Sequence, residues 1–174
     1  MDDANTALAR LCRAMDELLS HVEGVPDPAF CLRPPGEEWS LAETVEHVAL
    51  ATQATLARLR QLFASPLPPD VKRFDDGKIE AEMFRMDGPA PALAVPTGRF
   101  ATRAAGVAAL RAACDGIAEW VAQLERNPRE FGLPHPVFGS FDGVQWILFA
   151  AAHADNHAPQ LRAIRARLAL APPS

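Results

Sequence analysis

The chain has 174 residues, of which 49% are hydrophobic and 22% charged. This is the size of one domain with enough apolar residues for a core, so a disordered tail and a disulfide-stapled miniprotein are excluded. With 17 Lys and Arg against 22 Asp and Glu, the net charge is −5. The absence of a basic tract argues against nucleic acid as a partner.

Hydrophobic periodicity predicts a first helix over residues 3–22, whose apolar residues recur at spacings of three and four. Residues 24–38 carry four of the sixteen prolines and cannot be helical throughout. A second helix is predicted from Ser40, because Ser40 and Glu43 form the S-x-x-E pattern of a capping box directly after Trp39. Its apolar stripe continues to Leu62.

The stretch from residue 66 to residue 98 is rich in Pro, Gly and Asp, and we expect it to span the body of the molecule, with a short helix near residues 79–86. A third helix is predicted to start at Thr97 or Gly98 and to end at the Asn127-Pro128 pair. A fourth follows the sequence FGSFDG and continues to Leu168. Pro159 lies inside it and predicts a kink.

Strand signals are poor, so the predicted fold is all-α, one four-helix bundle formed by residues 1–174. Short links favour antiparallel neighbours for helices one and two and for helices three and four. The long crossover between helices two and three lets these two run parallel. The expected topology is therefore up-down-down-up.

The three cysteines, Cys12, Cys31 and Cys114, are odd in number, far apart, and form no C-x-x-C pair. The pattern therefore indicates neither a disulfide framework nor a cysteine zinc site. The N-terminus lacks the basic and apolar regions of a secretory signal, and the most apolar stretch, Val144 to Ala152, is well short of the ~20 residues that span a bilayer. We expect a soluble, cytoplasmic protein without a membrane partner.

Two histidines, His153 and His157, are four residues apart and so project from one face of the fourth helix. They lie on its apolar stripe, where an unpartnered imidazole is costly. If helices two and four are neighbours, His47 reaches the same point. Three neutral imidazoles suit Zn, Ni, Fe or Cu better than Mg or Ca, and the stripe lacks the carboxylates of a di-iron bundle. The alternative is a set of partly buried histidines bonded to their neighbours.

For the other candidate polar residues we expect capping, supporting or surface roles. Glu43 is half of the capping box, and Gln160 could orient His157. We expect solvated side chains, or groups that support the ligands, at Glu46, Asp155 and Asn156. Structural or surface roles are expected for His21 and His135, and a solvated face for Arg162, Arg165 and Arg167.

Two motifs, W-[ST]-x-x-E-x-x-x-H at Trp39 to His47 and H-x-x-x-H followed by Gln at His153 to Gln160, resemble those of the DinB/YfiT-like superfamily of metal-binding four-helix bundles. The resemblance implies that His47, His153 and His157 hold a divalent transition metal (Zn, Ni or Fe), often in a homodimer. Some members of that superfamily are S-transferases for low-molecular-weight thiols such as bacillithiol or mycothiol. Others are thiol-dependent isomerases of maleylpyruvate.

The functional hypothesis is a metal-dependent S-transferase, in which the ion lowers the pKa of a low-molecular-weight thiol that attacks a small electrophile. Hydrolysis by activated water is a variant. A hypothesis from another class is a bundle that binds metal without catalysis, as a stress-response or interaction protein. A third possibility is an apo remnant of the family, in which the histidines merely satisfy one another. We expect Trp39, the loop of residues 30–38 and part of residues 66–97 to form the pocket wall.

Overall fold

The computed structural model describes residues 2–67, 74–83, 89–135 and 138–170. In chain order, its helices and strands are α1 (Asp2–Ser20), α2 (Asp27–Cys31), α3 (Leu41–Gln61), a 3-10 turn (Leu62–Ala64), α4 (Asp76–Met83), a 3-10 turn (Ala92–Ala94), α5 (Arg103–Ala122), a 3-10 turn (Pro128–Glu130), β1 (Gly132–His135), β2 (Gly139–Asp142) and α6 (Gly143–Arg167).

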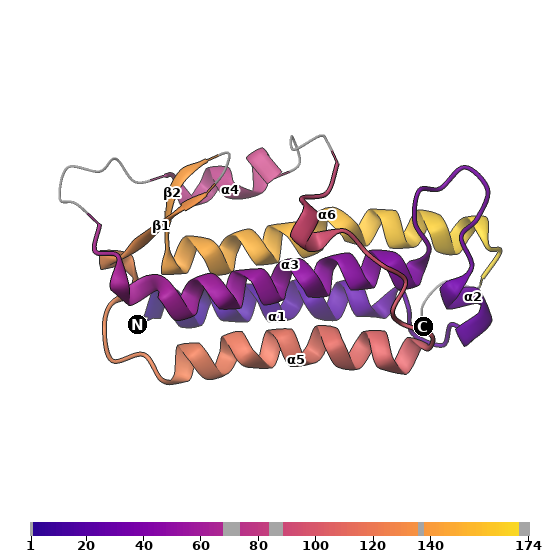
Figure 1. The fold of residues 1–174 in the computed structure, drawn as a ribbon, viewed down its shortest axis with the longest axis horizontal. Helices are drawn as coiled ribbons and strands as arrows, with labels where there is room; N and C mark the ends of the chain where they lie inside the picture. The colour runs from indigo at the N-terminus through magenta and orange to yellow at the C-terminus, as the bar shows by residue number, and fades with distance from the viewer. Residues whose placement is uncertain (1, 68–73, 84–88, 136–137, 171–174) are drawn as a thin grey trace.

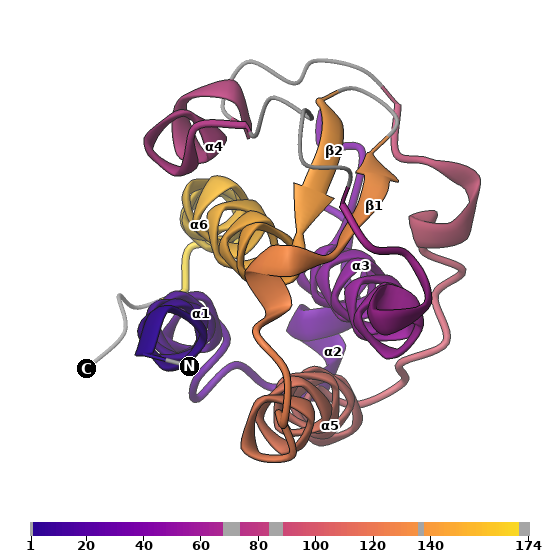
Figure 2. The same cartoon turned by 90° about the vertical axis from the view of Figure 1, so that its left-hand side faces the viewer.

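The long helices α1, α3, α5 and α6 lie side by side and form a four-helix bundle (Figures 1 and 2). Helices α1 and α6 run in one direction and α3 and α5 in the other, which confirms the up-down-down-up topology (Figure 1). The crossover between α3 and α5 returns along the outside of the bundle and includes α4. In the described part of the chain, no helix is both long enough and apolar enough to span a membrane.

The neighbours within the bundle differ from the prediction. Helix α1 packs on α6 and α5, and α3 packs on α5 and α6, so α1 and α3 face each other across a diagonal (Figure 2). The links of residues 21–40 and 123–142 were expected to be short enough to enforce adjacency. They contain α2 and the β-hairpin respectively and are long enough to cross an end of the bundle. The prediction that helices two and four could be neighbours is confirmed.

The predicted apolar stripes form the core, and the fully buried side chains from the four helices include Leu11, Leu18, Leu59, Leu110, Ile117, Ile147 and Leu161. Between α3 and α5 the fit is close. A Cβ on Gly116 would lie 2.5 Å from Cδ2 of Leu56, so glycine makes room for this leucine.

The start of α3 is the predicted capping box. The Glu43 amide donates to Ser40 Oγ at 3.2 Å, and the Ser40 amide donates to Glu43 Oε2 at 2.8 Å. The start of α5 is later than predicted, at Arg103, with Thr102 as its cap. The reason lies just upstream, because Gly98 has a φ of +74°, outside the helical region, while the amides of residues 97–99 donate to a buried glutamate of α3.

Two further differences concern the links. Strands β1 and β2 form an antiparallel hairpin, from Gly132 opposite Asp142 to His135 opposite Gly139, where no strand was predicted. The strands are only four residues long, and Pro134 breaks the pattern that would have indicated β1. The short helix expected near residues 79–86 exists as α4 but begins at Asp76, and residues 84–86 lie outside the described residues. Helix α6 continues through Pro159, and the kink stays a prediction.

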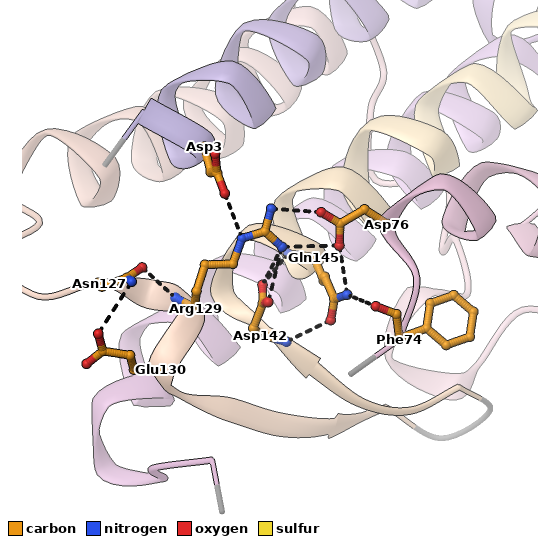
Figure 3. Close-up of polar contacts among 8 residues, drawn as sticks. All are labelled: Asp3, Phe74, Asp76, Asn127, Arg129, Glu130, Asp142 and Gln145. Carbon is orange, nitrogen blue, oxygen red and sulfur yellow. Dashed lines mark hydrogen bonds and ion pairs between the residues drawn. The ribbon is translucent and has the colours of Figure 1, made fainter. Parts of the chain in front are cut away.

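The guanidinium of Arg129 ties three elements together at one end of the bundle (Figure 3). It donates to Asp3 of α1 at 3.1 Å, to Asp76 of α4 at 2.7 Å and to Asp142, the cap of α6, at 3.2 Å. Gln145 adds a bond from its amide nitrogen to the Phe74 carbonyl at 2.6 Å. This cluster fixes the start of α6 and holds α4 against it.

At the opposite end, Arg162 and Arg167 of α6 are exposed as expected, whereas Arg165 is not part of the expected solvated face. Arg165 is buried and donates to the carbonyls of His21 and Glu23, each at 3.0 Å. Arg167 pairs with Glu37 at 2.6 Å. Both side chains therefore hold the link between α1 and α3 against the end of α6.

Candidate metal centre

The structure brings the three predicted histidines to one point between α3 and α6. His47 lies in the second turn of α3 with 4% of its surface exposed, and His153 and His157 face it from α6, partly buried. Nε2 of His153 lies 3.1 Å from Nε2 of His47 and 3.2 Å from Nε2 of His157. One nitrogen from each ring lies within 4.8 Å of both others.

The outer nitrogens of two rings have fixed partners. Nδ1 of His47 donates to the carbonyl of Ala94 at 2.7 Å, and Nδ1 of His157 donates to Oε1 of Gln160 at 2.8 Å. Each neutral imidazole has one proton, so both Nε2 atoms carry a lone pair. Only His153 can supply a proton to the space between the three rings.

Burial keeps these imidazoles neutral. It lowers the pKa of His47, although the bond with Ala94 opposes this effect, and it lowers the pKa of His157 to about 4. Burial lowers the pKa of His153 well below its ordinary value, and the two other imidazoles lower it further. At neutral pH the cluster is therefore a set of lone pairs without the protons to satisfy them.

This arrangement fits a metal ion better than it fits three histidines that satisfy one another. Two nitrogens bound to one zinc ion at 2.0–2.1 Å are separated by roughly 3.0–3.4 Å, depending on the coordination angle. The two separations from His153, 3.1 and 3.2 Å, match that range, and all three nitrogens lie within 4.8 Å of one another. The donor set of three neutral imidazoles suits Zn, Ni or Fe.

One side of the cluster is covered by Trp39, and the other opens into a pocket. The Trp39 ring lies 4.8 Å from the His47 ring and 6.4 Å from the His157 ring, between centroids. The pocket has a volume of about 340 Å³ and extends between α3 and α6 beneath residues 89–94 of the crossover. The predicted contribution of the crossover is confirmed, whereas the predicted contributions of Trp39 and of residues 30–38 are wrong, since none of these residues is in the described lining of the pocket.

Two acidic residues expected to be solvated or to support the ligands have other roles. Glu46 is fully buried and points away from the site, where its carboxylate accepts bonds from Thr97, Gly98 and Arg99. Asp155 pairs with Arg10 of α1. Glu46 nevertheless bears on the site, because the residues it binds begin three positions after Ala94.

The sequence analysis missed three contributors to the site. The Ala94 carbonyl has no side-chain signature, so no pattern could reveal it. His135 was expected to be structural or at the surface; it is buried in an aromatic cluster with Phe141 and Phe149 and lines the pocket. Arg58 also lines the pocket, three turns beyond His47 on α3, and that spacing was the available signal.

A family model described as the DinB superfamily matches residues 10–161. The chain belongs to the DinB superfamily. In this DinB chain, the matched region includes the three histidines and all four bundle helices, in whole or in large part.

Two individual proteins are similar over most of their length. The uncharacterized protein YuaE of Bacillus subtilis (strain 168) is 24% identical over 153 residues, which cover 87% of this chain and 93% of that protein. A crystal structure described as TT2238, a four-helix bundle protein, aligns with a TM-score of 0.58 at 25% identity and covers 92% of this chain and 98% of its own. Both likenesses support the fold.

Proposed function

We propose that this DinB protein is an enzyme that transfers a low-molecular-weight thiol to a small electrophile, with one divalent ion (Zn, Ni or Fe) held by His47, His153 and His157. The observation that carries the proposal is the convergence of three imidazole nitrogens with only one proton available among them. A divalent ion bound there supplies Lewis acidity, which lowers the pKa of a coordinating thiol.

The protein's own residues hold the site ready. The Ala94 carbonyl and the Gln160 amide oxygen fix the tautomers and ring orientations of His47 and His157. Trp39 packs over both rings and shields that side of the cluster from water. The pocket leaves the other side accessible to small molecules.

The pocket's composition favours transfer of an external nucleophile. Its described lining contains no cysteine, serine, lysine or carboxylate, and Thr55 offers the single hydroxyl among those residues. A covalent mechanism on the protein would need an activated nucleophile, and hydrolysis would gain from a carboxylate base. A thiol co-substrate supplies the nucleophile that the described lining lacks.

Metal analysis of untagged protein tests the site. We expect about one divalent ion per chain in the wild type and its loss in His47→Ala and His153→Ala. The matched control is His21→Gln, which changes a histidine remote from the cluster and should keep the metal. Wild-type protein without metal under metal-replete conditions would contradict the site and favour an apo remnant.

Transfer is tested with monobromobimane and a panel of thiols that includes bacillithiol and mycothiol. The reaction forms a carbon–sulfur bond and releases bromide and the thiol proton. We expect metal-dependent turnover with at least one thiol, lost in His153→Ala. A metal-loaded protein without a rate above background for any thiol would favour the non-catalytic metal-binding bundle.

A further inference from the structure

The pocket beside the histidine cluster is an elongated groove between two helices. On α3 its lining residues, His47, Ala51, Ala54, Thr55 and Arg58, recur on one face. On α6, Trp146, Phe149 and His153 do the same. Met83 of α4, Pro89, Pro91 and Leu93 of the crossover, and His135 of β1 complete it.

One end of this groove holds the histidines and the other end holds a cation. Arg58 is eleven residues beyond His47, which corresponds to about 16 Å along the helix. Trp146 is seven residues before His153, which corresponds to about 10 Å. Between the two ends the lining is almost entirely apolar, with Thr55 and the His135 ring as its polar groups.

Arg58 is the charged side chain of the groove's described lining, and its charge is not neutralised there. Its guanidinium lies over the Trp146 ring, 5.2 Å from the centroid, and donates to the Pro134 carbonyl at 3.4 Å. No carboxylate of the described residues pairs with it. Two neutral contacts hold the guanidinium at the groove and leave donors for an anion, since a guanidinium has five N–H groups.

We propose that the groove binds an elongated apolar carboxylate, whose carboxylate lies on Arg58 and whose far end reaches the histidine cluster. For the proposed transferase this names the shape and charge of the substrate, whose electrophilic carbon would have to lie at the end remote from the carboxylate, and the proposal rests on that function only in this respect. A chain of roughly eight to twelve carbons spans the distance between the two ends. The volume of about 340 Å³ is at the lower end of small-molecule sites and too small for a folded partner.

Charge and burial together select this class. The apolar walls gain free energy from hydrocarbon, whereas they offer few partners to sugars or nucleotides. A cationic head group would meet Arg58 without a compensating carboxylate in the described lining. A neutral alcohol of the same length would keep the apolar contacts and lose the charge-assisted bond.

Calorimetry on metal-free, chelator-treated protein tests the proposal with decanoate, 1-decanol and decylamine as probes. We expect decanoate to bind at least tenfold more tightly than the other two. Arg58→Gln should weaken decanoate binding about tenfold and leave decanol unchanged, and Arg58→Lys should keep most of the preference. The control is Arg60→Gln, an exposed arginine of the same helix, which should bind as wild type.

Equal affinity for decanoate and decanol, an equal loss in Arg60→Gln, or no binding of any probe would overturn the proposal. The far-UV circular dichroism spectrum of Arg58→Gln, measured separately, shows whether that variant is folded. If it is not folded, the proposal is judged by the Arg58→Lys variant and by the preference of the wild type for decanoate over decanol and decylamine. Because the groove is probed without metal, failure of the transferase assay leaves this result standing, and failure here leaves the metal site standing.

Discussion

Replacing the buried Glu46 by glutamine is expected to destabilise the protein by roughly 3 kcal/mol. The carboxylate accepts bonds from the amide and hydroxyl of Thr97 and from the Gly98 amide, each at 2.9 Å, and from the Arg99 amide at 3.1 Å. An amide of the same size has one acceptor oxygen. If that oxygen faces Gly98 and Arg99, the Thr97 N–H loses its acceptor, at about 1–3 kcal/mol, and the remaining bonds lose their charge assistance.

Urea unfolding of metal-free protein measures this change, and a loss of roughly 3 kcal/mol corresponds to about 6–12 °C in Tm. The control is Glu119→Gln, an exposed glutamate of α5, expected to change stability by less than about 0.5 kcal/mol. A loss below about 1 kcal/mol in Glu46→Gln would refute the reasoning.

The pH dependence provides a second check on Glu46. Burial raises the pKa of this carboxyl, but the bonds from Thr97, Arg99 and Gly98 outweigh burial and hold the pKa below its ordinary value. Its stabilisation is therefore present above the ordinary pKa and is lost as the pH falls through the lowered one. The difference between wild type and Glu46→Gln should be constant near neutral pH and shrink below about pH 4.

Two other substitutions test the interpretation of buried charge and buried histidine. Arg129→Leu is expected to lower the free energy of unfolding in urea by about 3–5 kcal/mol, because it leaves the carboxylate of Asp142, 1% exposed, without its cation. The control is Arg13→Leu at an exposed arginine of α1. Equal losses in the two variants would contradict the role of Arg129. Burial lowers the pKa of His135 to about 4, and the charge of Arg58 is the second cause. Between pH 6.5 and pH 4 the unfolded chain therefore binds a proton that the folded chain does not. The free energy of unfolding falls as the pH falls through this window. Metal-free wild type should lose about 2 kcal/mol more than His135→Phe between pH 7 and pH 5, and parallel losses would show that His135 does not titrate in this way.

Helix spacing let the sequence predict the histidine cluster. His153 and His157 share a face because they are one helical turn apart, whatever the rest of the chain does. The S-x-x-E pattern at Ser40 fixed the start of α3 for a similarly local reason, since the cap bonds residues three apart. Periodicity likewise placed the four bundle helices, because each apolar stripe must be buried.

The remaining features depend on contacts between distant segments. Sequence could not decide that α1 lies diagonal to α3, because link length permits either arrangement. The sequence predicted that α5 starts at Thr97 or Gly98, but Gly98 has a φ of +74°, and the carboxylate that binds this non-helical segment, Glu46, lies some fifty residues earlier.

Local spacing thus determined the helices and placed two of the three imidazoles on one face. Tertiary structure decided that α3 lies against α6, which brings His47 to the other two, and that the crossover places the Ala94 carbonyl on its ring. It also formed the groove that connects the cluster to Arg58. The physical reason is that helical periodicity depends only on residues three or four positions apart. Neighbouring helices and backbone acceptors are brought together only when the whole chain is folded.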